Sequence, residues 1–188
     1  NRRSRARGRG QLAAAGSRPG GCGGSTCSTT QQGIVNTAAA NATLIAGKAL
    51  GYLQSLKTDP NGLYKTWFDA SDGKQLWNTV EGHYTTVYGA FASKQATFDC
   101  SCKKRYYAYV YPTQPYTIYI CNVFWTAPDL GRDSKAGTLV HEMSHFNVTA
   151  GTKDWVYGAT GAMGLAQTDV TQSSTNADNH EYFAESQP

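Results

Sequence analysis

Small and apolar residues recur every three to four positions through residues 29–56, which is the spacing of one helix face. They are Ile34, Ala38, Ala42, Ile45, Ala49 and Leu53. Alanine has the highest helix propensity, so this pattern predicts one long amphipathic helix. A turn is expected at residues 59–62, whose sequence is Asp-Pro-Asn-Gly. Apolar and aromatic positions continue through residues 63–91 and predict one or two further helices.

The hydrophobic period changes between residues 106 and 121. Tyrosines alternate there with small apolar residues, at Tyr107, Ala108, Tyr109, Val110 and Tyr111. A proline-containing turn leads into a second run, Tyr-Thr-Ile-Tyr-Ile-Cys. Alternation in two such runs predicts a β-hairpin. With a C-terminal helix that includes Tyr182 and Phe183, the chain is expected to be an α+β protein. We predict a mainly helical fold with a small antiparallel sheet.

The stretch from Gly137 to Phe146, Gly-Thr-Leu-Val-His-Glu-Met-Ser-His-Phe, combines apolar residues with chemically active ones. On a helix, His141 and His145 would project from one face, about one turn apart. Glu142 would point to the neighbouring side, where it can reach a water without being a ligand. This spacing predicts two zinc ligands and a general base. The apolar flanks strengthen the prediction, because such polar residues are costly to bury without a metal.

A catalytic zinc also takes a third protein ligand and keeps one position open. Asp154 follows His145 across Gly151, which can end the helix and turn the chain back, so its carboxylate can complete the site. A glutamate from a later helix is the alternative, and Glu181 or Glu185 could supply it. The third histidine of the metzincin signature is missing, because Gly151 occupies its position.

These motifs resemble a known family. The histidine motif, combined with the stretch from Gly151 to Gly158 (Gly-Thr-Lys-Asp-Trp-Val-Tyr-Gly), resembles the aspzincins, which are deuterolysin-like zinc peptidases. The stretch from Asn176 to Phe183, Asn-Ala-Asp-Asn-His-Glu-Tyr-Phe, resembles their peptidyl-Lys metalloendopeptidase branch. The resemblance extends from Cys27 to the C-terminus. It implies a zincin-like fold, with the small sheet beside the active-site helix, and a secreted zinc endopeptidase.

The resemblance also implies roles for single residues. His141, His145 and Asp154 would hold one zinc ion per chain. Glu142 would be the general base, and Tyr157 would donate a hydrogen bond to the developing oxyanion. A non-catalytic zinc-binding module is an alternative, but a purely structural site has no need of Glu142.

Asp178 and Glu181 are the predicted substrate-binding residues. They lie three positions apart, so on a helical turn both carboxylates face the same way. Two neighbouring carboxylates repel each other, and a bound cation offsets this repulsion, so such a pair is typical of a cation-binding site. In the lysine-specific branch, acidic residues at the matching positions bind the substrate ammonium. We therefore expect cleavage on the N-terminal side of lysine, with a deuterolysin-like endopeptidase of broader specificity as the alternative.

The five cysteines indicate the redox compartment. None has histidine partners at zinc-finger spacing, so a disulfide framework in an oxidising compartment is expected. Cys100 and Cys102 are too close in sequence to be expected to pair with each other. The family resemblance implies the pairs Cys27–Cys100 and Cys102–Cys121, which leaves Cys22 as the odd thiol.

Residues 1–26 differ in composition from residues 27–188. They contain six arginines and a glycine-rich run, with too few apolar residues to pack. We expect a flexible arm, either a pro-segment remnant or a linker, before a peptidase domain. The chain has 17 basic and 13 acidic residues, so without the six arginines 11 basic residues face 13 acidic ones, a charge of about −2.

This slightly acidic body argues against a nucleic-acid binder, although the arginine arm alone would allow one. No apolar run approaches the length of a membrane span, and no signal-sequence pattern is present. The expectation is therefore a mature or partly processed, secreted monomer that acts on proteins or peptides. Neither nucleic acid nor membrane is expected as a partner.

Overall fold

A computed structural model describes residues 26–55 and 58–188. Cys22 and almost all of the predicted arm lie outside the described residues, so the boundary near residue 26 stays a prediction. The described chain is mainly helical, with one small sheet. This confirms the predicted fold class.

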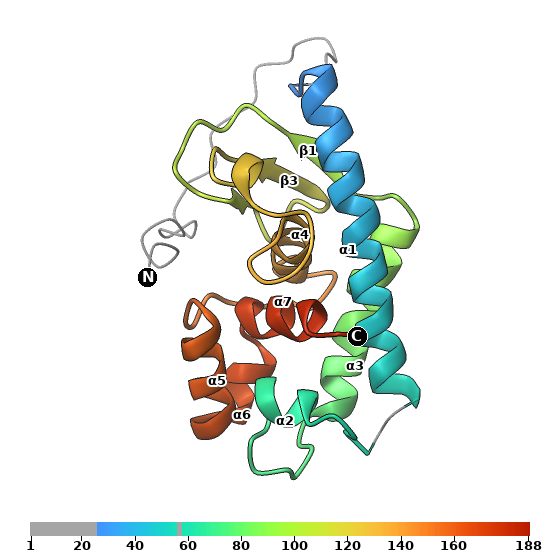
Figure 1. The fold of residues 1–188 in the computed structure, drawn as a ribbon, viewed down its shortest axis with the longest axis vertical. Helices are drawn as coiled ribbons and strands as arrows, with labels where there is room; N and C mark the ends of the chain where they lie inside the picture. The colour runs from blue at the N-terminus through green and yellow to red at the C-terminus, as the bar shows by residue number, and fades with distance from the viewer. Residues whose placement is uncertain (1–25, 56–57) are drawn as a thin grey trace.

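Helix α1 (Thr29–Ser55) is the predicted long helix, and it runs along one side of the molecule (Figure 1). Its buried face packs against α3 (Trp77–Ala92) and α4 (Lys135–Ser144). Small side chains on this face let the neighbouring helices approach closely: Ala38, Ala42, Ala46 and Ala49. The predicted turn after α1 leads into the short helix α2 (Leu63–Trp67). The pattern in residues 63–91 therefore corresponds to two helices.

The sheet has three strands in the order β1-β3-β2. The predicted hairpin forms its antiparallel part, where β2 (Ala108–Tyr109) pairs with β3 (Thr117–Ile120). On the other side of β3, β1 (Thr97–Asp99) pairs in parallel. The sheet is therefore mixed rather than purely antiparallel. Sequence did not indicate β1, because three residues are too few to show a period and the pairing is non-local.

Helix α4 lies in the middle of the molecule, between the sheet and α7 (Ala177–Glu185) (Figure 1). All ten of its residues are buried, because α1, α7 and the sheet all pack against it. Helices α5 (Ala159–Thr168) and α6 (Val170–Ser174) connect the chain after α4 to α7, and a short 3₁₀ helix, η1 (Phe124–Thr126), precedes α4. The motif helix is thus a core element.

Two disulfides join these elements, Cys27–Cys100 and Cys102–Cys121. They are the pairs that the family resemblance implied. The first fastens the start of α1 to the end of β1, and the second closes the segment that contains the hairpin. Among the described residues, no helix is both long enough and apolar enough to cross a bilayer.

Candidate metal centre

Helix α4 begins at a well-defined cap and carries the histidine motif in its last turns. The Oγ of Ser134 accepts a hydrogen bond from the backbone N–H of Gly137, which caps the helix. His141 and Glu142 lie within the helix, and His145 is the residue that ends it. Residues four apart in a helix are separated by about one turn, so both imidazoles lie on the same side of α4.

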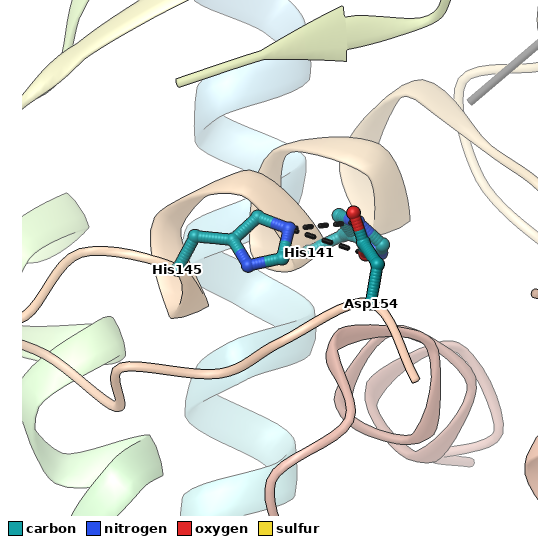
Figure 2. Close-up of side chains that lie close together, drawn as sticks. All are labelled: His141, His145 and Asp154. Atoms are coloured by element: carbon teal, nitrogen blue, oxygen red, sulfur yellow. Dashed lines mark hydrogen bonds and ion pairs between the residues drawn. The ribbon is translucent and has the colours of Figure 1, made fainter. Parts of the chain in front are cut away.

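The side chains of His141, His145 and Asp154 converge on one point, as Figure 2 shows. The Nε2 atoms of the two histidines are 3.1 Å apart. The Oδ1 atom of Asp154 is 3.1 Å from Nε2 of His141 and 3.4 Å from Nε2 of His145. The structure thus brings together the three predicted ligands, one from the helix, one from its end and one from the following loop.

The opposite nitrogen of each imidazole faces a hydrogen-bond acceptor. Nδ1 of His145 is 2.9 Å from the backbone oxygen of Thr152, and Nδ1 of His141 is 2.8 Å from Oδ1 of Asp178. With the proton on Nδ1, a neutral imidazole has a lone pair on Nε2. Two such lone pairs and a carboxylate oxygen then point at each other, an arrangement that a divalent cation stabilises. Imidazole and carboxylate ligands with these hydrogen-bonded partners fit zinc.

The loop after α4 holds Asp154 in place through backbone contacts. Gly151 has a φ of 59°, a left-handed conformation that glycine adopts without steric cost. The backbone N–H of Thr152 donates to the oxygen of Ser144, which ties the loop to the helix end. Lys153, just before the ligand, pairs with Asn176 in a parallel bridge. Just after the ligand, the N–H of Trp155 donates to Oδ1 of Asn176 at 2.9 Å, so the chain is held on both sides of Asp154.

Asp154 is electrostatically coupled to the two histidines. Burial by itself would raise the pKa of this carboxyl. The imidazoles of His141 and His145 outweigh burial and lower the pKa of Asp154 well below its usual range. The carboxylate is therefore ionised at neutral pH, as a metal ligand must be.

The two predicted catalytic residues lie on the same two segments as the ligands. Glu142 is buried on α4, next to the first histidine. Tyr157 is partly exposed in the loop between Asp154 and α5. Next to it, Gly158 has a φ of 82°, and its N–H donates to Oδ2 of Asp178 at 2.6 Å. The roles of Glu142 and Tyr157 stay predictions.

The predicted substrate-binding pair lies directly behind the first ligand. Asp178 and Glu181 are fully buried on α7, and both face Nδ1 of His141, at 2.8 Å and 3.3 Å. Together with His141 they form a second group of metal-ligand residue types. A carboxylate on the far nitrogen of a ligating histidine is a common way to orient the ring. Sequence reasoning missed this contact, because it depends on how α7 packs against α4.

Glu185, one of the alternative third ligands, lies elsewhere. Its carboxylate accepts hydrogen bonds from the backbone N–H groups of Asp133 and Ser134, at the start of α4. Burial and the nearby Glu181 carboxylate raise the pKa of Glu185 to about 8. Neither Glu181 nor Glu185 joins the group formed by the two Nε2 atoms and Asp154.

The two other histidines form a separate pair. Nδ1 of His83 on α3 is 3.1 Å from Nε2 of His180 on α7, and Nδ1 of His180 is 2.9 Å from the backbone oxygen of Asn176. His180 also contacts the rings of Tyr84 and Phe68. Burial, followed by repulsion from His83, lowers the pKa of His180 to about 3. This pair is therefore neutral at physiological pH.

Comparison with known proteins places this arrangement among peptidases. An "Extracellular protease" of Aeromonas hydrophila is 50% identical over 163 residues, which are 86% of this chain and 46% of that relative. A "Peptidyl-Lys metalloendopeptidase" of Pleurotus ostreatus is 43% identical over 163 residues, covering 86% of this chain and 95% of the relative. A solved zinc peptidase from Grifola frondosa matches with a TM-score of 0.77 and 43% identity, over 85% of this chain and 96% of that one.

Some of these relatives are longer than the present chain. The matched region is 46% of the Aeromonas hydrophila protein and 46% of the Grifola frondosa peptidyl-Lys metalloendopeptidase sequence, so the chain spans about half of their length. The aspzincin family model, described as "Lysine-specific metallo-endopeptidase", matches residues 54–185. This range includes the two predicted ligand histidines, Asp154 and the acidic pair on α7. The chain therefore belongs to the aspzincin family of metallopeptidases.

Proposed function

We propose that this chain is a secreted zinc endopeptidase that cuts protein chains on the N-terminal side of lysine. The observation that carries the proposal is the convergence of two imidazole Nε2 atoms and one carboxylate oxygen within 3.4 Å of each other. Each imidazole directs its other nitrogen at an acceptor, so the lone pairs face inward. Catalytic zinc typically has three protein ligands and leaves its fourth position to water or substrate, whereas structural zinc has four protein ligands.

Zinc in such a site supplies Lewis-acid chemistry: it polarises a peptide carbonyl and lowers the pKa of water to about 7. In the proposed reaction, Glu142 accepts a proton from the attacking water and then delivers it to the leaving amine. Tyr157 donates its hydroxyl hydrogen to the developing oxyanion. One oxygen of Asp178 faces Nδ1 of His141, and the other accepts a hydrogen bond from the N–H of Gly158. Asp178 thus fixes the imidazole of His141 relative to the loop that carries Tyr157.

The preference for lysine rests on Asp178 and Glu181. Two carboxylates side by side repel each other, and a substrate ammonium stabilises both. The compact charge of lysine, on a long stem, suits two point charges better than the planar guanidinium of arginine does. Relatives from Pleurotus ostreatus and Grifola frondosa, named peptidyl-Lys metalloendopeptidases, support this part of the proposal.

Burial limits how the lysine can reach this pair. Both side chains have no exposed surface in this structure. A substrate ammonium can therefore contact them only when neighbouring side chains move aside. If that movement does not occur, the acidic pair only orients His141, and the enzyme has the broader specificity of a deuterolysin-like peptidase.

Secretion and the partners belong to the same proposal. The two disulfides require an oxidising compartment, and the Aeromonas hydrophila relative is named an extracellular protease. We expect the protein to act as a monomer on protein or peptide substrates, without nucleic-acid or membrane partners.

The decisive experiment is digestion of a denatured, lysine-containing protein by the zinc-loaded chain, with and without a zinc chelator. We expect new N-termini that begin with lysine, and no products in the presence of chelator. Glu142→Gln protein is the matched control for a contaminating protease. New N-termini spread over many residue types would favour the broader peptidase, and a zinc-loaded chain without any products would be a non-catalytic zinc module.

A further inference from the structure

A close contact between Gly137 and Glu185 joins the start of α4 to the end of α7. A Cβ atom added to Gly137 would lie 2.0 Å from Oε1 and 2.5 Å from Cδ of Glu185. These distances are far below van der Waals contact, so no larger residue fits at position 137 while Glu185 keeps its place. The two positions are therefore sterically matched.

The Glu185 carboxyl group also binds the N-terminal end of the α4 backbone. Oε1 accepts hydrogen bonds from the N–H and the Oγ–H of Ser134, both at 2.8 Å, and Oε2 accepts from the N–H of Asp133 at 3.0 Å. Ser134 Oγ in turn accepts from Gly137. A carboxyl group at a helix N-terminus satisfies backbone donors that have no partner within the helix.

Helix α7 thereby contacts α4 at both ends. Near its C-terminus, Glu185 binds Asp133 and Ser134, the two residues just before α4, and the hydroxyl of Tyr182 donates to Oδ1 of Asp133. Near its N-terminus, Asp178 and Glu181 face Nδ1 of His141, almost two turns further along α4. The contact of Glu185 with the start of α4 therefore also limits how far α4 can slide relative to Asp178 and Glu181.

We infer that Glu185 is a positioning residue that sets the register of α4 against α7, and thus the place of His141 relative to Asp178 and Glu181. Glu185 contacts neither the ligand atoms nor, in the proposed reaction, the substrate. Its effect reaches the site through the position of a rigid helix. The consequence for lysine cleavage rests on the proposed function, whereas the consequence for metal binding does not.

The variants that test this role are Glu185→Ala, Glu185→Gln and Gly137→Ala, each in the otherwise complete chain. Glutamine keeps one acceptor oxygen and loses the other, so it should give an intermediate effect. Displacement of α4 should raise the zinc dissociation constant roughly 10-fold in Glu185→Ala, comparable to the loss of an outer partner of a ligand. The measurements are chelator competition for zinc and the visible absorption of the cobalt(II)-substituted protein, which reports ligand geometry.

The steric match gives a second, independent prediction. Gly137→Ala should displace Glu185 and reproduce the effects of Glu185→Ala in the wild-type background. In the Glu185→Ala background the same substitution should be neutral or stabilising, because alanine favours a helix interior more than glycine does. A double-mutant cycle measured by urea unfolding reveals this change of sign.

Asp59 provides a matched control. Its carboxylate also accepts from one hydroxyl, that of Tyr52, and from two backbone N–H groups, those of Tyr64 and Lys65, but it joins α1 to α2. Asp59→Asn should lower stability and leave the cobalt spectrum, the zinc affinity and the ratio of lysine to arginine cleavage unchanged. In Glu185→Ala, that ratio should fall at least several-fold in zinc-saturated enzyme.

The inference is wrong if the Glu185 variants lose stability as Asp59→Asn does, yet keep the wild-type spectrum, zinc affinity and cleavage ratio. It is also wrong if Gly137→Ala and Glu185→Ala prove additive. A wild-type chain that cuts no lysine bond would instead contradict the proposed function, and the zinc and cobalt measurements would still decide the role of Glu185. If Glu185→Ala does not fold, Glu185→Gln and Gly137→Ala supply the same readouts.

Discussion

Among single residues, Glu142 and Asp154 are two carboxylates of one proposed site that are predicted to have different functions. Asp154 points its oxygen at both imidazoles, whereas Glu142 is predicted to handle protons only. We expect Asp154→Ala to lose zinc together with activity. Glu142→Gln should keep zinc while turnover falls by roughly 10² to 10⁴, the usual contribution of a general base. Metal analysis and peptide hydrolysis on the same samples check both expectations.

Glu81→Gln, a substitution on α3, is a suitable control and should keep both zinc and activity. Loss of zinc from Glu142→Gln would show that Glu142 is itself a ligand. Loss of zinc from Glu181→Gln but not from Asp154→Asn would instead support a glutamate as third ligand.

His180 gives a prediction about pH. Burial lowers the pKa of His180 to about 3 in the folded chain from the ordinary histidine value of about 6.5, so folding disfavours the protonated form. The unfolded chain binds this proton first as pH falls. The free energy of unfolding is therefore unaffected by protonation of His180 above about pH 6.5, and it decreases as pH falls from 6.5 towards 3. The loss is up to about 1.4 kcal/mol per pH unit for one proton.

Urea unfolding at several pH values, with zinc at saturation, measures this slope. His180→Gln should show a shallower slope between pH 6.5 and 5, since proton uptake at the zinc site is common to both proteins. Equal slopes in the two proteins would mean that His180 does not cause the pH dependence.

At the level of elements, α7 carries two carboxylates that face one nitrogen but differ in their other contacts. Asp178 holds both His141 and the N–H of Gly158, whereas Glu181 approaches His141 at the longer distance of 3.3 Å. Asp178→Asn should therefore weaken zinc binding by about 10- to 100-fold as well as reduce lysine preference. Glu181→Gln should lose lysine preference and keep most of its zinc affinity. Zinc titration and sequencing of digestion products separate the two effects.

The two disulfides should contribute to stability according to the loops that they close. Cys27–Cys100 spans 73 residues and Cys102–Cys121 spans 19. Chain entropy predicts stabilisation of about 4 kcal/mol for the longer loop and about 3 kcal/mol for the shorter one. Replacing each pair by serines and measuring urea unfolding tests this order. A larger loss for Cys102–Cys121 would mean that local packing, and not loop length, decides its contribution.

For the whole molecule, residues 1–26 are expected to be dispensable. Deleting them keeps Cys27 and both disulfides, so the truncated chain should fold and keep its kcat/KM within about two-fold, a difference of about 0.4 kcal/mol in transition-state stabilisation. Peptide hydrolysis by the two forms checks this. Strong activation on truncation would indicate instead that an arginine of this segment binds the acidic pair, Asp178 and Glu181, in the full chain.

Much of the fold and of the candidate site could be predicted because it depends on patterns among residues that are close in sequence. The alanine-rich period fixed the extent of α1, and the spacing of His141 and His145 required a helix. Elements that depend on distant contacts were missed. Strand β1 exists because it pairs with β3, and the contact of Asp178 with His141 exists because α7 crosses α4. Gly137, just ahead of the histidine motif, was the one sequence signal for close packing at that crossing.

The bridge between Lys153 and Asn176 also bears on whether the chain can digest itself at this position. The bond between Thr152 and Lys153 is of the type that the enzyme is proposed to cut, and it lies directly before a zinc ligand. A peptidase binds its substrate as an extended strand with available main-chain groups. Here the N–H of Lys153 donates to Thr175, and its carbonyl accepts from Ala177. The contacts that fix Asp154 thus also withhold this bond from self-digestion.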